Sequence, residues 1–130
     1  MTVFIVDQET TIADACAEIL RLNGITARAF YDGQDALKAA SEEPPQLVIH
    51  DVSKSELEGF APVDEFKRRF PACQVVLMSA NAAVMLDSPK TTVEVLYKPI
   101  HPTILVERVR AAQNKEASAP IHGVSRQEVL

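Results

Sequence analysis

Five short apolar runs alternate along the chain with longer segments in which apolar residues recur at helical spacing. An apolar run of roughly four to eight residues is typical of a strand that is covered on both faces. The five runs occupy residues 3–6, 25–30, 46–50, 74–78 and 93–97. This strict alternation predicts an α/β fold with a parallel sheet and helices on both of its faces.

The first segments between the runs carry clear signals of where helices begin and end. Residues 10–23 have an apolar helical stripe, and Gly24 after them is a natural helix terminator. Asp32 is suited to N-cap a second helix, and the Pro44-Pro45 pair would stop that helix. Two helices are therefore predicted in the first half of the chain.

The second half of the chain has weaker helix signals. Residues 51–60 are polar and are predicted to form a loop, with Pro62 in the first turn of the helix that follows. A short fourth helix is predicted over residues 81–86. Pro102 opens the last helix, which we expect to end at Asn114.

Length and composition favour one domain with a flexible end. Residues 1–114 are predicted to form the domain, and residues 115–130, which are small and polar, a flexible C-terminal tail. The net charge is −5 and there is no basic stripe, so we expect no direct nucleic-acid partner. No run reaches membrane-spanning length and no signal peptide is evident, which predicts a cytoplasmic protein without a membrane partner. Cys16 and Cys73 lack metal-binding spacing and are expected to be buried, reduced thiols.

Polar residues close four of the five runs. Asp7 follows the first run, Asp51 the third, Ser79 the fourth and Lys98 the fifth. In an open parallel sheet the carboxyl ends of the strands converge on one edge, where binding sites form. Two carboxylates, a hydroxyl and a lysine at that edge indicate phosphate chemistry.

These strand ends are parts of longer motifs whose order and approximate spacing resemble those of the response-regulator receiver domain. The motifs are Val6-Asp7-Gln8-Glu9, Leu47-Val48-Ile49-His50-Asp51-Val52, Gly59-Phe60, Leu77-Met78-Ser79-Ala80 and Tyr97-Lys98-Pro99-Ile100. The likeness covers residues 2 to about 114. It implies a doubly wound, flavodoxin-like α/β/α fold with five parallel strands in the order 2-1-3-4-5.

The resemblance also implies a function in two-component signalling. Asp51 resembles the aspartate that accepts a phosphoryl group from a histidine kinase or a phosphotransfer protein. Ser79 resembles the switch hydroxyl and Lys98 the conserved cation, with a cis peptide bond between Lys98 and Pro99. Magnesium is implied at a site made of Asp7, Gln8, Asp51 and the backbone carbonyl of Ser53.

The chain departs from the family pattern at several positions. Gln8 stands where the family has a second acid, so we expect weak Mg²⁺ binding, with Glu9 as a poorly placed substitute. Only 18 residues separate Ser79 from Lys98, which predicts a short or irregular fourth helix. Val95 replaces the family's aromatic switch residue. Tyr97 lies on the same strand face and is expected to be packed or half exposed.

Two further expectations follow. His50 precedes Asp51 and points to the opposite sheet face, so we expect a core or helix-contacting histidine. The resemblance implies that the region from Ala82 to Asn114 contacts a downstream protein or a second copy of the chain.

Three other functions compete with the phosphorylated receiver. A pseudo-receiver would keep the fold as a binding module without phosphorylation, because Gln8 weakens the metal site. A phosphatase of the haloacid-dehalogenase type also uses a strand-end aspartate, but it needs a second aspartate at the position of Ser53. A flavodoxin-like FMN carrier would need a loop rich in Ser, Thr and Gly after the first strand, where Asp7 and Glu9 would repel phosphate. The sequence therefore favours a signalling phosphoacceptor over an enzyme acting on a separate substrate.

Overall fold

The computed structural model describes residues 1–52, 56–80 and 94–122, and the side chains of residues 1–52, 61–80 and 94–114. Its strands form one sheet in which every pairing is parallel and the order is β2-β1-β3-β4-β5. The strands are β1 (Thr2–Val6), β2 (Thr26–Phe30), β3 (Leu47–Asp51), β4 (Gln74–Ser79) and β5 (Glu94–Tyr97). The predicted strand order is confirmed.

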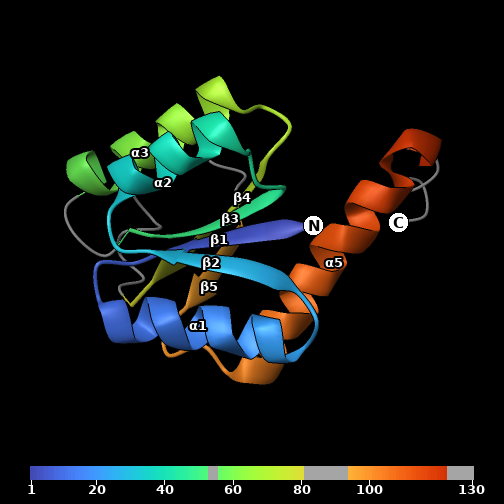
Figure 1. Cartoon of the computed structure of the whole chain (residues 1–130), viewed down its shortest axis with the longest axis horizontal. Coiled ribbons are helices and arrows are strands. Elements are labelled where there is room, and N and C mark those ends of the chain that lie inside the picture. The colour runs from blue at the N-terminus through green and yellow to red at the C-terminus, as the bar shows by residue number, and fades with distance from the viewer. Residues whose placement is uncertain (53–55, 81–93, 123–130) are drawn as a thin grey trace.

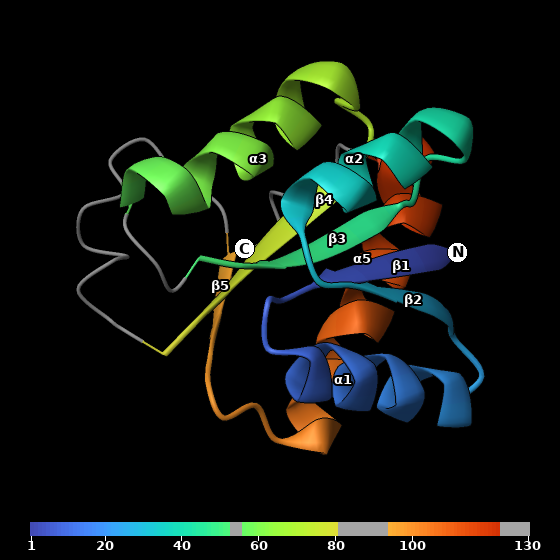
Figure 2. The same cartoon turned by 60° about the vertical axis from the view of Figure 1, so that its left-hand side comes forward.

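Helices cover both faces of this sheet, giving the predicted three layers (Figures 1 and 2). Helices α1 and α5 lie against one face, and α2 and α3 lie against the other. The described helices are α1 (Thr10–Leu22), α2 (Gly33–Glu42), α3 (Glu56–Arg69) and α5 (Pro102–His122). The predicted fourth helix falls in residues 81–93, outside the described residues.

Alternate residues along the strands build a core on each side of the sheet. Val3 and Ile5 of β1 pack with Leu20 of α1 on one side, whereas Phe4 packs with Phe66 of α3 on the other. All of these side chains are fully buried, and each contributes about 1.5–3 kcal/mol relative to an exposed position. Cys16 and Cys73 are buried as expected.

The ends of the first two helices follow the sequence signals. Gly24 adopts a φ of +79° after α1, a left-handed conformation that glycine takes without steric cost. The Asp32 side chain accepts a hydrogen bond from the Gln34 backbone N–H at 2.9 Å, capping α2. Both predictions are therefore confirmed.

Helices α3 and α5 differ from the expectations. Helix α3 begins at Glu56, so the predicted polar loop is shorter and Pro62 lies inside the helix. Proline removes one backbone hydrogen bond there, and the helix continues across that gap. Helix α5 continues to His122, through half of the segment expected to be a flexible tail. Residues 123–130 lie outside the described residues, and the boundary at residue 114 stays a prediction.

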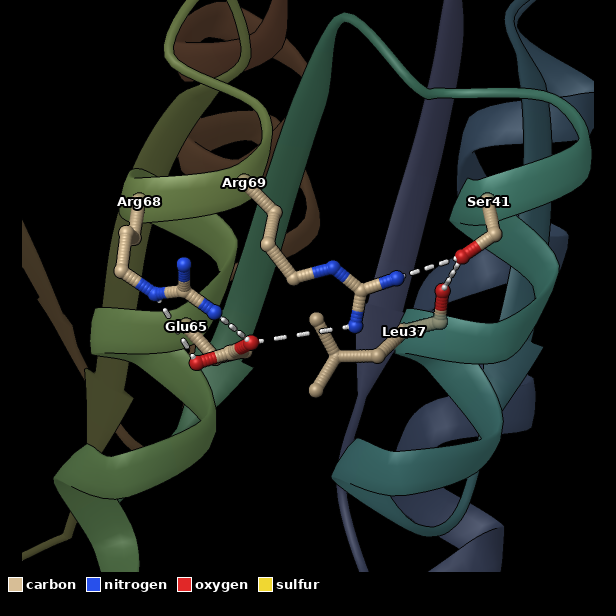
Figure 3. A network of polar contacts seen from close by, with 5 residues as sticks. All are labelled: Leu37, Ser41, Glu65, Arg68 and Arg69. Atoms are coloured by element: carbon tan, nitrogen blue, oxygen red, sulfur yellow. Dashed lines mark hydrogen bonds and ion pairs between the residues drawn. The ribbon is translucent and has the colours of Figure 1, made fainter.

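A polar network joins the C-terminal ends of α2 and α3 (Figure 3). The Arg69 guanidinium donates to the Ser41 hydroxyl at 2.6 Å, and that hydroxyl donates to the Leu37 carbonyl at 3.1 Å. Glu65 pairs with Arg68 and lies 3.9 Å from Arg69. The network holds two helices together on the face of the sheet opposite α1 and α5.

None of the described helices has the length and apolar character needed to cross a membrane.

Candidate functional site

Asp7, Asp51 and Lys98 meet at the carboxyl edge of the sheet. Asp7 follows β1, Asp51 ends β3, and Lys98 follows β5. Strands β1 and β3 are neighbours at the centre of the sheet, and the strand order reverses between them, so a crevice forms at this point. Lys98 lies beside the end of β4, and its backbone N–H donates to the Ser79 carbonyl oxygen at 2.9 Å. The Lys98-Pro99 peptide bond is cis, as predicted.

The Lys98 ammonium bridges the two carboxylates. Its Nζ lies 2.8 Å from Oδ2 of Asp7 and 2.8 Å from Oδ1 of Asp51. The other oxygen of Asp7, Oδ1, accepts a hydrogen bond from the Glu9 backbone N–H at 2.9 Å. The two acids and the lysine thus form one connected cluster.

This cluster is largely withdrawn from water. The side chains of Asp7, Asp51 and Lys98 are 1%, 9% and 10% exposed, so their charges interact more strongly than surface charges do. Burial alone would lower the pKa of Lys98, but its hydrogen bonds to Asp51 and Asp7 outweigh burial and raise that pKa. Burial raises the pKa of Asp7, despite the opposing hydrogen bond from Lys98. Lys98 is therefore held firmly as a cation at neutral pH.

Ser79 lies on the strand between those that supply Asp51 and Lys98. It ends β4, pairs with Tyr97 of β5, and is fully buried. Its backbone is fixed by the Lys98 N–H, which places the residue at the same sheet edge as the acids. The position suits a hydroxyl donor to a group bound at Asp51.

The remaining predicted ligands contribute less. Gln8 is exposed at the surface after β1, and Ser53 lies outside the described residues. Glu9 is 67% exposed, and its Oε1 lies 3.7 Å from Nζ of Lys98. An ion pair exposed to this extent is weak. Glu9 is thus near the cluster but at its rim.

The donor set fits a hard cation only in part. Asp7 and Asp51 converge on one point and offer the carboxylate oxygens that Mg²⁺ prefers. Within the described ranges, no group of three or more His, Cys, Asp or Glu side chains is arranged to hold a metal ion.

His50 has a contact that sequence reasoning missed. It is 5% exposed and packs edge-on against Phe66 of α3, with ring centroids 6.4 Å apart, as a helix-contacting histidine. Its Nδ1 also lies 3.0 Å from the backbone oxygen of Asp51. The alternation of side chains along a strand does not predict this contact, because the His50 ring bonds to a backbone oxygen and not to a side chain.

Val95 and Tyr97 lie on one face of β5, as predicted. Val95 packs beside the buried cluster of Val52, Val63 and Leu77, whereas Tyr97 is 54% exposed. Tyr97 is therefore half exposed at the edge of the site.

The fold and this cluster define a three-layer α/β domain with two acids and a lysine at the carboxyl edge of its sheet, and comparison with known proteins gives the family. Residues 3–110 match the response regulator receiver domain family, and the chain belongs to that family. Receiver domains as a family bind Mg²⁺ at an acidic pocket.

Three relatives illustrate the likeness. The receiver domain of NtrX from Brucella abortus has 29% identity and a TM-score of 0.76, covering 86% of this chain and 98% of that one. A putative NtrX-like response regulator from Rickettsia bellii is 31% identical over 84 residues, which are 63% of this chain and 18% of that protein. The DNA-binding transcriptional regulator NtrC from Proteus hauseri is 26% identical over 80 residues, 62% of this chain and 17% of NtrC. The chain thus spans less than a fifth of these two curated relatives.

Proposed function

We propose that this receiver domain accepts a phosphoryl group on Asp51 from a histidine kinase or a phosphotransfer protein. The observation that supports this most strongly is the Lys98 ammonium, 2.8 Å from both Asp51 and Asp7. The Asp51 carboxylate can act as the nucleophile, and the buried Lys98 ammonium would offset the negative charge of the phosphoryl group that it gains. The protein is then a signalling phosphoacceptor, whose chemistry is limited to its own phosphorylation and dephosphorylation.

The transfer is a displacement at phosphorus. An Asp51 carboxylate oxygen forms a P–O bond as the P–N bond of phosphohistidine breaks. The electron pair of the P–N bond returns to the imidazole nitrogen, and the ring leaves neutral after taking up a proton. Water later attacks the phosphorus of the acyl phosphate, which releases inorganic phosphate and restores the carboxylate of Asp51.

The surrounding groups position the reactants and balance charge. Lys98 pairs with Asp51 at rest and with a phosphoryl oxygen afterwards. The Ser79 hydroxyl donates to a second phosphoryl oxygen. Asp7 and Asp51, with the Ser53 carbonyl and the Gln8 amide, would hold Mg²⁺, which supplies charge neutralisation on the phosphoryl oxygens. With Gln8 neutral, this binding is weak.

The phosphorylated domain would pass its signal to a partner through the β5–α5 side. Tyr97 on β5 and Ile104 on α5 are large, apolar and about half exposed, at 54% and 49%. Such residues suit a protein contact, made by a downstream protein or a second copy of the chain. Residues 82–93, the first part of the predicted surface from Ala82 to Asn114, lie outside the described residues.

A pseudo-receiver is the alternative, and one observation favours it. Gln8 brings no charge to the metal and its side chain is exposed. In a pseudo-receiver the Asp7–Lys98–Asp51 cluster would be a fixed ion-pair network, and partner binding would be independent of phosphorylation. Failure of the wild-type protein to gain a phosphoryl group would favour this alternative.

Acetyl phosphate with Mg²⁺ tests the proposed roles, with intact mass as the readout. Lys98→Met should slow phosphoryl gain by about a hundredfold, the usual effect of removing a charge-stabilising donor. Ser79→Ala should have a smaller effect, about tenfold. Lys38→Met, an exposed lysine on α2, is the matched control and should label at the wild-type rate. Wild-type labelling of Lys98→Met would remove Lys98 from the mechanism.

A further inference from the structure

His50 makes a hydrogen bond whose direction can be assigned. Its Nδ1 lies 3.0 Å from the Asp51 backbone oxygen. A carbonyl oxygen only accepts, so Nδ1 carries a proton and donates it. The hydrogen bond therefore runs from the His50 ring to the main chain of Asp51.

The same peptide group is held from its other side. The Val52 N–H donates to the Met78 carbonyl of β4 at 2.9 Å. The peptide unit between Asp51 and Val52 therefore has its carbonyl bonded by His50 and its N–H bonded to the sheet. Its plane is fixed just where β3 ends, and the orientation of that plane sets the direction of the Asp51 side chain.

The His50 ring has little room to move. A Cβ added at Gly33, the first residue of α2, would lie 3.2 Å from Nε2 of His50 and 2.7 Å from Cβ of Pro62. The start of α2 thus lies close to both the His50 ring and Pro62 of α3, while Phe66 of α3 packs against the ring. The polar network at the far ends of α2 and α3 holds the same two helices together (Figure 3).

We propose that His50 is a positioning residue for the phosphoacceptor Asp51, although it lies on the opposite face of the sheet. This inference rests on the proposed function of Asp51. The hydrogen bond from Nδ1 holds the Asp51 peptide, and the packing of α2 and α3 holds the ring. Small displacements of a nucleophile are costly, because about 1 Å can lower a rate by about a hundredfold.

Two amide variants separate the hydrogen bond from the packing. In His50→Asn the amide nitrogen falls near the place of Nδ1 and can donate to Asp51, whereas in His50→Gln it falls near Nε2 and cannot. Phosphoryl gain from acetyl phosphate should slow about tenfold in His50→Gln and stay within about threefold of wild type in His50→Asn. Lys38→Met, at an exposed position of α2 outside the α2–α3 polar network, should leave the rate unchanged.

Nuclear magnetic resonance keeps the test decisive if phosphorylation itself fails. The Asp51 Cγ and Lys98 Nζ resonances report their ion pair, and they should move in His50→Gln and return toward wild-type positions in His50→Asn. If the wild-type protein gains no phosphoryl group but the resonances follow this pattern, the proposed function is wrong and the positioning of Asp51 by His50 still holds. The inference is overturned if His50→Gln labels as fast as wild type, if His50→Asn is as slow as His50→Gln, or if both resonances stay in place.

Discussion

Charge at the sheet edge is set by four residues with unequal burial. Asp7, Asp51 and Lys98 are nearly inaccessible to water, whereas Glu9 stands at the rim, 67% exposed. Two buried acids against one buried cation leave a net negative charge, which attracts a divalent cation. Neutral Gln8 occupies the position where the family pattern has a further acid, so we expect Mg²⁺ to bind weakly here.

Replacing Gln8 by an acid should restore that affinity. Gln8→Asp is expected to tighten Mg²⁺ binding by roughly tenfold, because hard-cation sites are tuned by the charge of their ligands. Calorimetry on the two proteins measures this directly. Glu9→Gln is the matched test of the rim carboxylate and should change affinity less. Equal affinities for wild type and Gln8→Asp would mean that another group already supplies the charge.

The convergence of Asp7, Asp51 and Lys98 was predictable at the residue scale. Each directly follows or ends an apolar run, and parallel strands bring such ends to one edge. The hydrogen bond of His50 was not predictable, because side-chain alternation assigns faces and says nothing about contacts to the backbone. The exposure of Gln8 and the position of Glu9 likewise depend on the turn after β1.

At the scale of helices and strands, the structure differs from the sequence predictions in two helices, α3 and α5. Helix α3 contains Pro62, which sequence rules place in a first turn because it lacks a backbone donor. Six helical residues, 56–61, precede it, and its ring instead lies against the start of α2 at Gly33. Helix α5 likewise runs past the end of its apolar stripe. Strands and helices with strong apolar periods were predicted well, whereas these polar extensions carry no such signal.

The α2–α3 contact at Gly33 should tolerate no added methyl group. Gly33→Ala gains up to about 1 kcal/mol of helix propensity, but overpacking against Pro62 costs about 1–3 kcal/mol. A net loss in the free energy of unfolding is therefore expected from denaturant titration. Gln34→Ala, at the exposed next position, should be within about 0.5 kcal/mol of wild type. Equal stability of the two variants would show that α3 shifts freely.

The whole molecule has two differently built sides around one sheet. Helices α2 and α3 lie close to the His50 ring and are joined by their own polar network, whereas β5 and α5 leave Tyr97 and Ile104 half exposed. Glu94 of β5 and Arg108 of α5 form an ion pair across that second side. We expect any switch between two packings to involve this side, because it combines exposed apolar residues with an ion pair between two elements.

Phosphorylation should change that second side in solution. Beryllium fluoride, a phosphoryl mimic bound at Asp51, is expected to slow hydrogen exchange in α5 and in residues 82–93, and to leave β1 unchanged. Exchange read by mass spectrometry on wild type and Asp51→Asn measures this. If α5 exchanges identically with and without the mimic on wild type, the switch is absent and the pseudo-receiver is favoured.

The central claim is that Asp51 is the phosphoacceptor, and peptide-resolved mass measurement tests it most directly. After incubation with acetyl phosphate and Mg²⁺, the wild-type protein should gain one phosphoryl group, confined to the peptide that contains Asp51. Asp51→Asn, which is nearly isosteric, should keep the fold and gain none. Labelling that persists in Asp51→Asn, or a wild-type protein that takes up no phosphoryl group at all, would contradict the account.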